Sequence, residues 1–408
     1  MSFEQQRLFT PFQWLIVLMC VGFWLAYASS GVGYAEWRGM NPLGRDFYNF
    51  FNGGRAAWTG DVAWLYDREA YGVHNMANGV WSTYNFSYPP HSLPLLAPFG
   101  AFPYRLGFAM WAFGSAIAYF SVFRRVSFSG DSSIKLLVLM SPAVLISFFW
   151  GQTGMWVAAL LGGGLILMPR KPLVAGVFFG ILTVKPQIGL LLAPVLLFGG
   201  HYKVIIAATA TTMLMVAVSV ALYGLEPWTI YLTDTLRYQS ELLERSVGVF
   251  DYMVLTPYRS LILLGISKSA AMAVHILVMA TIVAVVAHMS IRKDEWTRIA
   301  SALLIGTAFM SPYFVVYDLV ILGLGMMFGW AYFSASTKNL LVASIFLALS
   351  PTLFVTGLPP TITALPTAII LLAGGLALKS LYDGRIFTLS ENESKPTSLG
   401  NDMVLKET

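Results

Sequence analysis

Apolar runs separated by short polar breaks fill most of the chain. A helix of about 20 apolar residues crosses the ~30 Å hydrocarbon core of a bilayer. Hydropathy and helix-breaking residues divide the chain into twelve such runs: Phe12–Ser29, Arg105–Phe123, Ile134–Phe149, Met155–Met168, Leu173–Thr183, Ile188–Phe198, Val204–Leu222, Ala270–Met289, Ile299–Met310, Val315–Phe333, Leu340–Thr356 and Ile362–Leu381. The pattern predicts an all-α polytopic membrane protein with about twelve transmembrane helices.

Two shorter runs, Leu93–Phe102 and Tyr258–Ile266, are too short to cross easily and fit re-entrant or interfacial helices. If they do not cross and the N-terminus is cytoplasmic, the clustered basic residues all fall inside, as the positive-inside rule requires. These are Arg124, Arg125, Arg170, Lys171, Lys203, Arg292, Lys293, Arg298, Lys338, Lys379 and Arg385. Both termini are then inside; thirteen or fourteen spans remain open if the short runs do cross.

This topology gives one integral-membrane domain over residues 1–385 and a polar, disordered cytoplasmic tail over 386–408. Two long segments, 30–104 and 223–268, lie outside, together with short polar breaks such as Gly151-Gln152. The inside loops have no room for a nucleotide-binding domain, and the chain has neither a P-loop nor a dinucleotide fingerprint.

Composition agrees with this picture. Residues are 57% hydrophobic and only 11% charged, whereas soluble domains are about 25% charged. The net charge of +5 comes from scattered loop residues, so nucleic acid is not an expected partner. Cys20 is the single cysteine, and no His, Cys and carboxylate cluster has metal-ligand spacing, so we expect neither a disulfide nor a metal or other cofactor.

The stretch NPLGRDFYNFFNGGRAAWTG, residues 41–60, places charged side chains soon after the first apolar run. Two interpretations of Asp46 are open: a surface acid paired with Arg45 or Arg55, or a general base that takes a proton from a hydroxyl. Asn49 either hydrogen-bonds a sugar or phosphate, or caps the helix.

A second polar group lies at breaks between apolar runs. In FSYPPHSLPLLAPFG, His91 stands where a rigid Tyr-Pro-Pro entry opens an apolar helix, and it is either an interfacial hydrogen-bonder or a ligand. In TVKPQIG, Lys185 either snorkels to the interface or binds a lipid-borne phosphate, since ionisable groups at membrane depth tend to be paired or functional. Gln152 and Gln187 are candidate hydrogen-bonding neighbours of Lys185. The alternative is that they are ordinary polar residues in turns between helices.

Late in the chain, SPYFVVYDLVIL puts Tyr317 and Asp318 at the start of an apolar run. Asp318 is a functional candidate or a charge that favours the helix N-terminus. The charged residues of the second outside segment line an acceptor cleft or form an amphipathic surface helix: Arg237, Glu241, Glu244, Arg245, Asp251 and Arg259.

Four motifs in order, GRDFYNFFNGGRAAWTGDVAWLYD, YPP, KPQ and the late SP…YD, resemble glycosyltransferase family 87 over most of the chain. The family consists of integral-membrane transferases of the C-type fold and includes polyprenyl-phosphate-mannose-dependent mannosyltransferases of bacterial envelopes. The resemblance implies that Asp46 is the catalytic base, that Lys185 lies near the donor phosphate and Gln187 near the sugar or phosphate. Other candidate donor-binding residues are Asn49, Arg55, His91, Gln152, Tyr317 and Asp318.

The implied activity is transfer of a mannose-like hexose from a polyprenyl-phosphate donor to a hydroxyl of a lipid or glycan acceptor. It would proceed with inversion at the periplasmic face of a bacterial inner membrane, among membrane lipids. The chain departs from the mannosyltransferases in having Tyr317 and Asp318 where they carry histidines, which leaves the donor sugar open. An acidic pair such as Asp46 with Asp318 would offer a metal site only if the fold brought the two together.

Two other classes of protein remain as alternatives. A lipid or glycolipid transporter or flippase would show a two-fold internal repeat with polar residues at mid-span, and no clear repeat is visible. A scaffold subunit would have no essential carboxylate.

Overall fold

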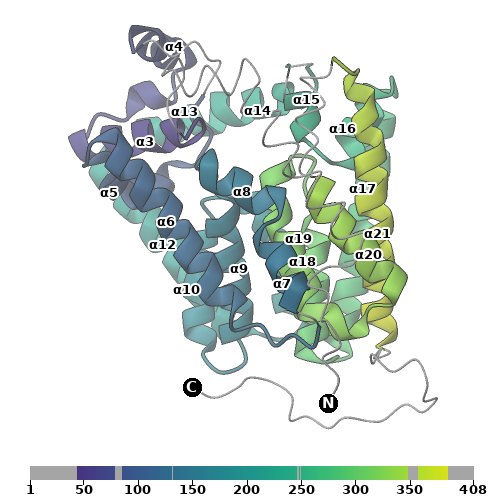
Figure 1. Ribbon diagram of the computed structural model, residues 1–408. Helices are drawn as coiled ribbons and strands as arrows, with labels where there is room; N and C mark the ends of the chain where they lie inside the picture. The colour runs from purple at the N-terminus through teal and green to yellow at the C-terminus, as the bar shows by residue number, and fades with distance from the viewer. Residues whose placement is uncertain are drawn as a thin grey trace, which may run out of the picture.

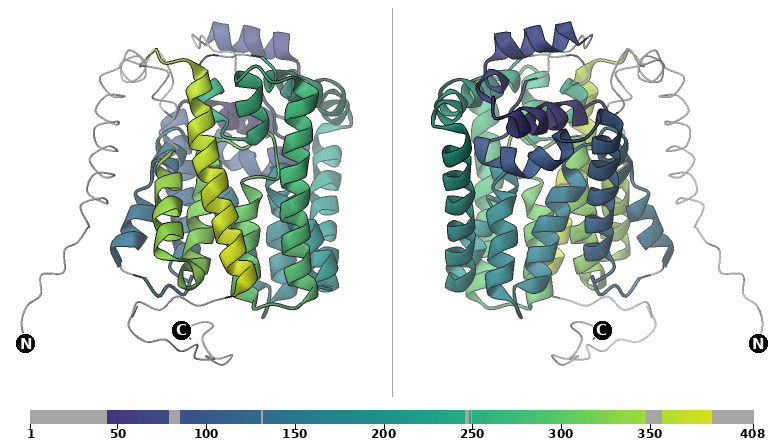
Figure 2. Two further views of the ribbon diagram at one scale, coloured as in Figure 1. Left: turned by 90° about the vertical axis from the view of Figure 1, so that its right-hand side faces the viewer. Right: turned by 90° about the vertical axis from the view of Figure 1, so that its left-hand side faces the viewer.

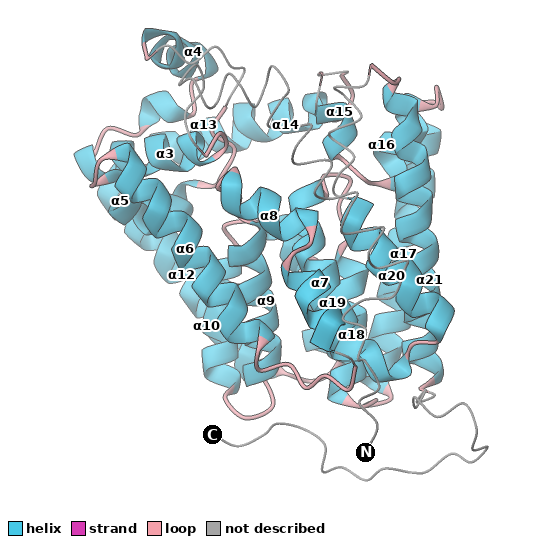
Figure 3. Ribbon diagram, in the orientation of Figure 1, coloured by secondary structure: helices cyan, strands magenta, loops and turns pink. Residues whose placement is uncertain are grey.

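The computed structural model describes residues 44–78, 85–130, 132–245, 248, 250–347 and 357–384. Helices make up 77% of it, and the described residues contain no β-strand (Figures 1 and 3). A bundle of long and short helices forms the body. Its members are α6 (Tyr104–Phe123), α7 (Ser132–Leu139), α8 (Pro142–Phe149), α9 (Gly154–Leu167), α10 (Pro172–Leu182), α11 (Leu192–Phe198), α12 (Tyr202–Tyr223), α17 (Lys268–Ile291), α18 (Trp296–Thr307), α19 (Leu319–Gly329), α20 (Ala335–Phe346) and α21 (Ala364–Asp383).

Short helices from two distant parts of the chain lie across one end of this bundle (Figures 1 and 2). The first part supplies α3 (Phe47–Thr59), α4 (Arg68–Ala77) and α5 (Leu93–Gly100), and the second α13 (Glu226–Ile230), α14 (Leu236–Leu242), α15 (Phe250–Met253) and α16 (Pro257–Leu263). We call these helices and their loops the end layer. The described parts of the two long segments expected outside therefore lie at the same end of the molecule.

Among the residues that the structure describes, five helical segments are long and apolar enough to cross a membrane: Tyr104–Phe123, Ser132–Phe149, Tyr202–Tyr223, Lys268–Ile291 and Pro360–Asp383. The other expected spans among the described residues are also helical, but they are shorter, such as α9 and α10. The first expected span, Phe12–Ser29, lies outside the described residues, as do the end of the run at 340–356 and the tail. The number of twelve spans therefore stays a prediction.

The two ambiguous runs form the seven- and eight-residue helices α16 and α5. Helices of that length rise only about 10–12 Å, which fits the expectation that they do not cross the bilayer. The loops with the clustered basic residues, including α6–α7, α9–α10 and α17–α18, lie at the end of the bundle opposite the end layer (Figure 1).

Helix α19 forms the centre of the core. All eleven of its residues are buried, and the largest apolar cluster joins it to α9 and α18. A helix that is apolar on every face is expected where protein surrounds it completely.

Two glycines bring the backbones of α3 and α5 into contact. A Cβ placed on Gly54 would overlap the Leu96 carbonyl, and a Cβ on Gly100 would overlap the Gly54 carbonyl carbon. Only glycine permits such an approach, so this pair fixes how α3 packs against α5.

The second part of the end layer is anchored to the residues just before α19. Val254 and Val315 form an isolated antiparallel bridge, the Leu255 N–H donates to the Phe314 carbonyl over 3.2 Å, and the Thr256 hydroxyl donates to Pro312 over 3.1 Å.

A buried ion pair holds the same stretch together. The Arg259 guanidinium binds Asp251 and also donates to the Leu243 carbonyl over 2.9 Å. By contrast, the Arg237 and Arg245 pairs with Glu241 are exposed. The charged residues of this segment thus divide into a structural buried pair and an exposed face.

Adding one methyl group should test the α3–α5 contact. Gly54→Ala and Gly100→Ala should each lower the free energy of unfolding by about 1–3 kcal/mol, the usual cost of overpacking. Gly72→Ala, in α4, is the matched control, because a Cβ there meets nothing within 4 Å. It should be neutral or slightly stabilising. Denaturation of the purified variants in detergent measures all three, and equal stability of all three would disprove the close contact.

Candidate functional site

Asp46 lies directly before α3 and is fixed to the end of α8. Its backbone N–H donates to the Trp150 carbonyl over 3.0 Å, and the N–H of Phe47 reaches the same oxygen. The Asp46 side chain is 13% exposed. It is therefore a largely covered carboxylate, not the solvated surface acid of the first interpretation.

The turn between α8 and α9 forms the wall next to Asp46. Gly151 has φ of +68°, and a Cβ there would lie 2.5 Å from the Cβ of Phe47, so the turn requires glycine for both conformation and space. The turn presents Gln152, whose side chain hydrogen-bonds to Asp46. The sequence suggested Gln152 as a neighbour of Lys185, and the structure places it against Asp46 instead, with the next residue, Thr153, near Lys185.

The surroundings of Asp46 favour its protonated form. Burial raises the pKa of Asp46, while the positive charge of Arg45 and the Gln152 hydrogen bond lower it by less. Arg45 is a loose partner, since its Nε lies 3.9 Å from Oδ1 and its guanidinium lies over the Trp150 ring. Oδ2 has no hydrogen bond to any residue that the structure describes. A carboxylate with a raised pKa and one buried oxygen that lacks a hydrogen-bond partner among the described residues is suited to accept a proton.

Lys185 and Asp318 form an ion pair in the apolar interior. The Lys185 Nζ lies 2.6 Å from Oδ1 of Asp318, and the two side chains are 4% and 0% exposed. Lys185 caps the 3₁₀ turn η3 (Pro186–Gly189) after α10, and Asp318 ends η5 (Val316–Asp318) before α19. The interfacial, snorkelling interpretation of Lys185 does not fit this burial.

The ammonium group of Lys185 has two further contacts, and one of them is in the α8–α9 turn. Nζ lies 3.5 Å from the Thr153 hydroxyl and 4.8 Å from the centre of the Tyr317 ring. Since Thr153 follows Gln152, two adjacent residues of one turn connect Asp46 to Lys185. We call Asp46, Gln152, Thr153, Lys185 and Asp318 the polar centre.

Tyr88 joins this centre and was not singled out from the sequence. Its hydroxyl lies 3.4 Å from the Thr153 hydroxyl. Burial raises the pKa of Tyr88, and the charges of Asp318 and Asp46 raise it further, so the phenol stays protonated and can donate a hydrogen bond. The YPP motif indicated a rigid helix entry but gave no sign that its tyrosine faces two carboxylates.

His91 occupies the edge of the same region. It is buried, its Nε2 lies 3.2 Å from the Thr183 hydroxyl, and its ring stacks on Trp228 at 5.6 Å. Burial lowers the pKa of His91, so the ring is neutral at pH 7. His91 thus connects the two parts of the end layer and contacts Thr183, which precedes Lys185 by two residues.

Three other candidate site residues are not members of the polar centre. Asn49 accepts a 2.5 Å hydrogen bond from the Tyr71 hydroxyl, which holds α4 on α3. Arg55 is exposed on α3, and none of the ion pairs among the described residues includes it. Gln187 lies half-buried in η3, two residues after Lys185.

No group of three or more His, Cys, Asp or Glu residues in the described ranges could hold a metal ion. The charge of Asp318 is balanced by Lys185, so Asp46 and Asp318 do not form an unbalanced acidic pair of the kind that would attract a cation.

An apolar helical bundle with a covered carboxylate beside a buried ion pair suggests an integral-membrane enzyme. The sequence model of glycosyltransferase family 87 matches residues 86–316, more than half of the 408 residues. The chain belongs to glycosyltransferase family 87 and is a membrane glycosyltransferase. No curated protein and no solved structure matches it.

The matched range divides the polar centre. Tyr88, Gln152, Thr153 and Lys185 lie inside it, whereas Asp46 lies before it and Asp318 just after. The role of Asp46 therefore depends on its geometry and on the resemblance of its motif.

Removing one charge of the buried pair should be more damaging than removing both. Lys185→Met leaves Asp318 buried without a partner and should cost about 3–5 kcal/mol of stability. The double variant Lys185→Met/Asp318→Asn should recover most of that loss. Thermal unfolding in detergent measures both, and a single variant as stable as the wild type would mean that the pair is not formed.

Proposed function

We propose that the chain transfers a hexose, mannose-like, from a polyprenyl-phosphate donor to a hydroxyl of a lipid or glycan acceptor, with inversion. The observation that carries this proposal is the arrangement of the polar centre. A carboxylate oxygen of Asp46 without a hydrogen-bond partner among the described residues and the buried ammonium of Lys185 lie on either side of the turn at Gln152-Thr153. Family membership supports sugar transfer, and it favours this function over a transporter or flippase.

In the proposed reaction, Asp46 accepts the proton of the acceptor hydroxyl as the oxygen attacks the anomeric carbon. The bond between that carbon and the phosphate oxygen breaks, and polyprenyl phosphate leaves with the bonding electrons. Attack opposite the leaving group inverts the anomeric configuration. The protonated Asp46 then returns its proton to solvent.

Lys185 is the proposed partner of the leaving phosphate. An ammonium has three N–H donors; Asp318 takes one at 2.6 Å and Thr153 lies at the longer distance of 3.5 Å. A phosphate can therefore bind Lys185 without displacing Asp318, which keeps the ammonium in place. A fixed positive charge in a site that excludes water stabilises the developing negative charge strongly.

The distribution of charge supports a periplasmic site in a bacterial inner membrane. The basic loops lie at the end of the bundle opposite the end layer (Figure 1), and basic loops mark the cytoplasmic side. The polar centre, which contacts the end layer through Asp46 and through Tyr88 at Thr153, would then face outward, where a lipid-linked sugar needs no nucleotide.

Asp46→Asn tests the general base. We expect a fall in kcat of about 10²- to 10⁴-fold, the usual contribution of a general base. The measurement is transfer from a polyprenyl-phosphate sugar by the purified protein. The related Asp61→Asn, in the exposed loop after α3, is the matched control and should be fully active.

Stability distinguishes this loss from misfolding. Because the folded pKa of Asp46 is raised, its contribution to stability is present at low pH and is lost as the pH rises through that pKa. The asparagine variant should therefore be at least as stable as the wild type at pH 7. Near wild-type turnover in Asp46→Asn would overturn the assignment.

The pH profile offers a separate check. Since the base works as a carboxylate and burial raises its pKa, kcat/KM should fall on the acid side at a pH above that of an ordinary aspartate. Gln152→Leu removes a hydrogen bond that lowers the pKa, so it should move this acid limb to still higher pH. An acid limb that does not move would show that another group limits the rate.

A further inference from the structure

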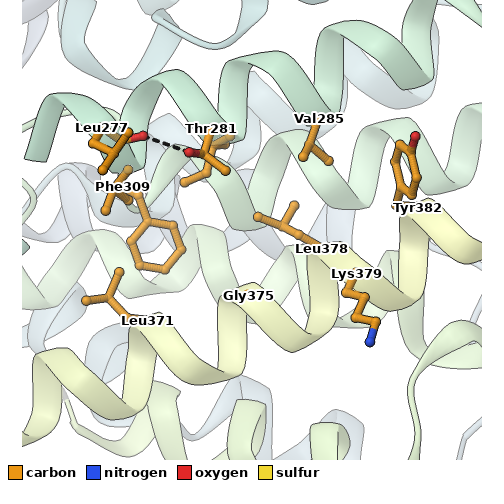
Figure 4. A pocket seen from close by; sticks show the side chains of 11 residues that line it. Leu277, Thr281, Val285, Phe309, Leu371, Gly375, Leu378, Lys379 and Tyr382 are labelled. Carbon is orange, nitrogen blue, oxygen red and sulfur yellow. Dashed lines mark hydrogen bonds between the residues drawn. The ribbon is translucent and has the colours of Figure 1, made fainter. Parts of the chain in front are cut away.

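An apolar groove of about 530 Å³ opens on the side of the bundle between α17 and α21. Figure 4 shows Leu277 and Val285 along one wall, Leu371 and Leu378 along the other, and Phe309 between them. Most of the groove is apolar, and Thr281 satisfies its own hydroxyl by donating to the Leu277 carbonyl within α17.

Gly375 gives the groove its depth. A Cβ on Gly375 would meet no atom within 4 Å, whereas a Cβ on the adjacent Gly374 would lie 2.6 Å from the Phe309 ring. Gly374 therefore serves helix packing, and Gly375 leaves open space although glycine costs about 1 kcal/mol relative to alanine inside a helix.

The surroundings of the groove indicate that it faces the lipid of the membrane. Both walls belong to candidate membrane spans, and Ile276 and Leu372 beside it are exposed apolar side chains. A hydrocarbon chain of a lipid is the occupant that this medium supplies to an apolar groove.

One end of the groove is polar and basic. Lys379 and Tyr382 line it there (Figure 4), close to the end of α21 at Asp383. Lys379 is exposed and belongs to none of the ion pairs between described residues. Arg292 lies over the Tyr382 ring at 4.5 Å, but Asp294 pairs with it at 2.6 Å, so the uncompensated positive charge at this end of the groove comes from Lys379.

We propose that the groove binds one acyl chain of an anionic glycerophospholipid, with the lipid phosphate against Lys379. This end of the bundle carries the basic loops and lies opposite the end layer (Figures 1 and 2). The bound lipid belongs to the leaflet opposite the polar centre and is distinct from the donor and the acceptor. It acts as a structural ligand that fills the space between α17 and α21.

The test uses the full-length protein in detergent, with the unfolding temperature measured against added phosphatidylglycerol or phosphatidylcholine. The wild type should be stabilised by phosphatidylglycerol at about fivefold lower concentration than by phosphatidylcholine, the factor expected of one lysine near an anionic lipid. Lys379→Gln should make the two lipids equal. Gly375→Phe should abolish the response to both.

Matched variants control for charge and bulk. Lys293→Gln removes a lysine from the same end of the bundle, and Leu372→Phe adds a ring to an exposed face of α21 outside the groove. Both should respond as the wild type does. If Gly375→Phe does not fold, Gly375→Leu fills the same space with a smaller side chain.

Three results would overturn the proposal: an equal response of the wild type to both lipids, an unchanged response in the filled variant, or a protein occupant. Gly375→Cys detects the last. A disulfide with the native Cys20 would mean that the predicted first span fills the groove, and a disulfide between two copies would mean that a second chain does.

Discussion

The ion pair between Lys185 and Asp318 is the constraint on which the arrangement of the site depends. Taking two charges out of water costs several kcal/mol per ion, and only close, well-satisfied pairing offsets it. The pair therefore forces the turn after α10 and the turn before α19 to meet, although the residues are 133 positions apart. Thr153 and Tyr317 complete the surroundings of the ammonium.

Asp46 is placed by a different kind of interaction. Backbone hydrogen bonds to Trp150 and the close packing of Gly151 against Phe47 fix the start of α3 on the α8–α9 turn. The same turn presents Gln152 to Asp46 and Thr153 to Lys185. One short turn therefore sets the spacing between the two charged groups of the polar centre, and neither group can shift without moving it.

The sequence predicted the all-helical class well, because each apolar run indicates by its own residues a segment that is buried in lipid or in protein. It also singled out Asp46, Lys185 and Asp318, since each charge in an apolar context is costly by itself. It could not pair Lys185 with Asp318, because that contact depends on how distant helices pack. Tyr88 and Thr153 are neutral residues of ordinary types, and nothing in their local pattern sets them apart.

The docking of the second part of the end layer has a consequence for protein engineering. Residues 254–256 contact 312–315 through a bridge and two hydrogen bonds, and Asp318 follows three residues later. A chimera that takes residues 243–260 from a relative must also take 311–315, or the incoming segment will meet a surface shaped for another partner. The second part of the end layer and the support of the buried ion pair are thus a single exchangeable module, although the 50 residues that separate them in the chain include α17 and α18.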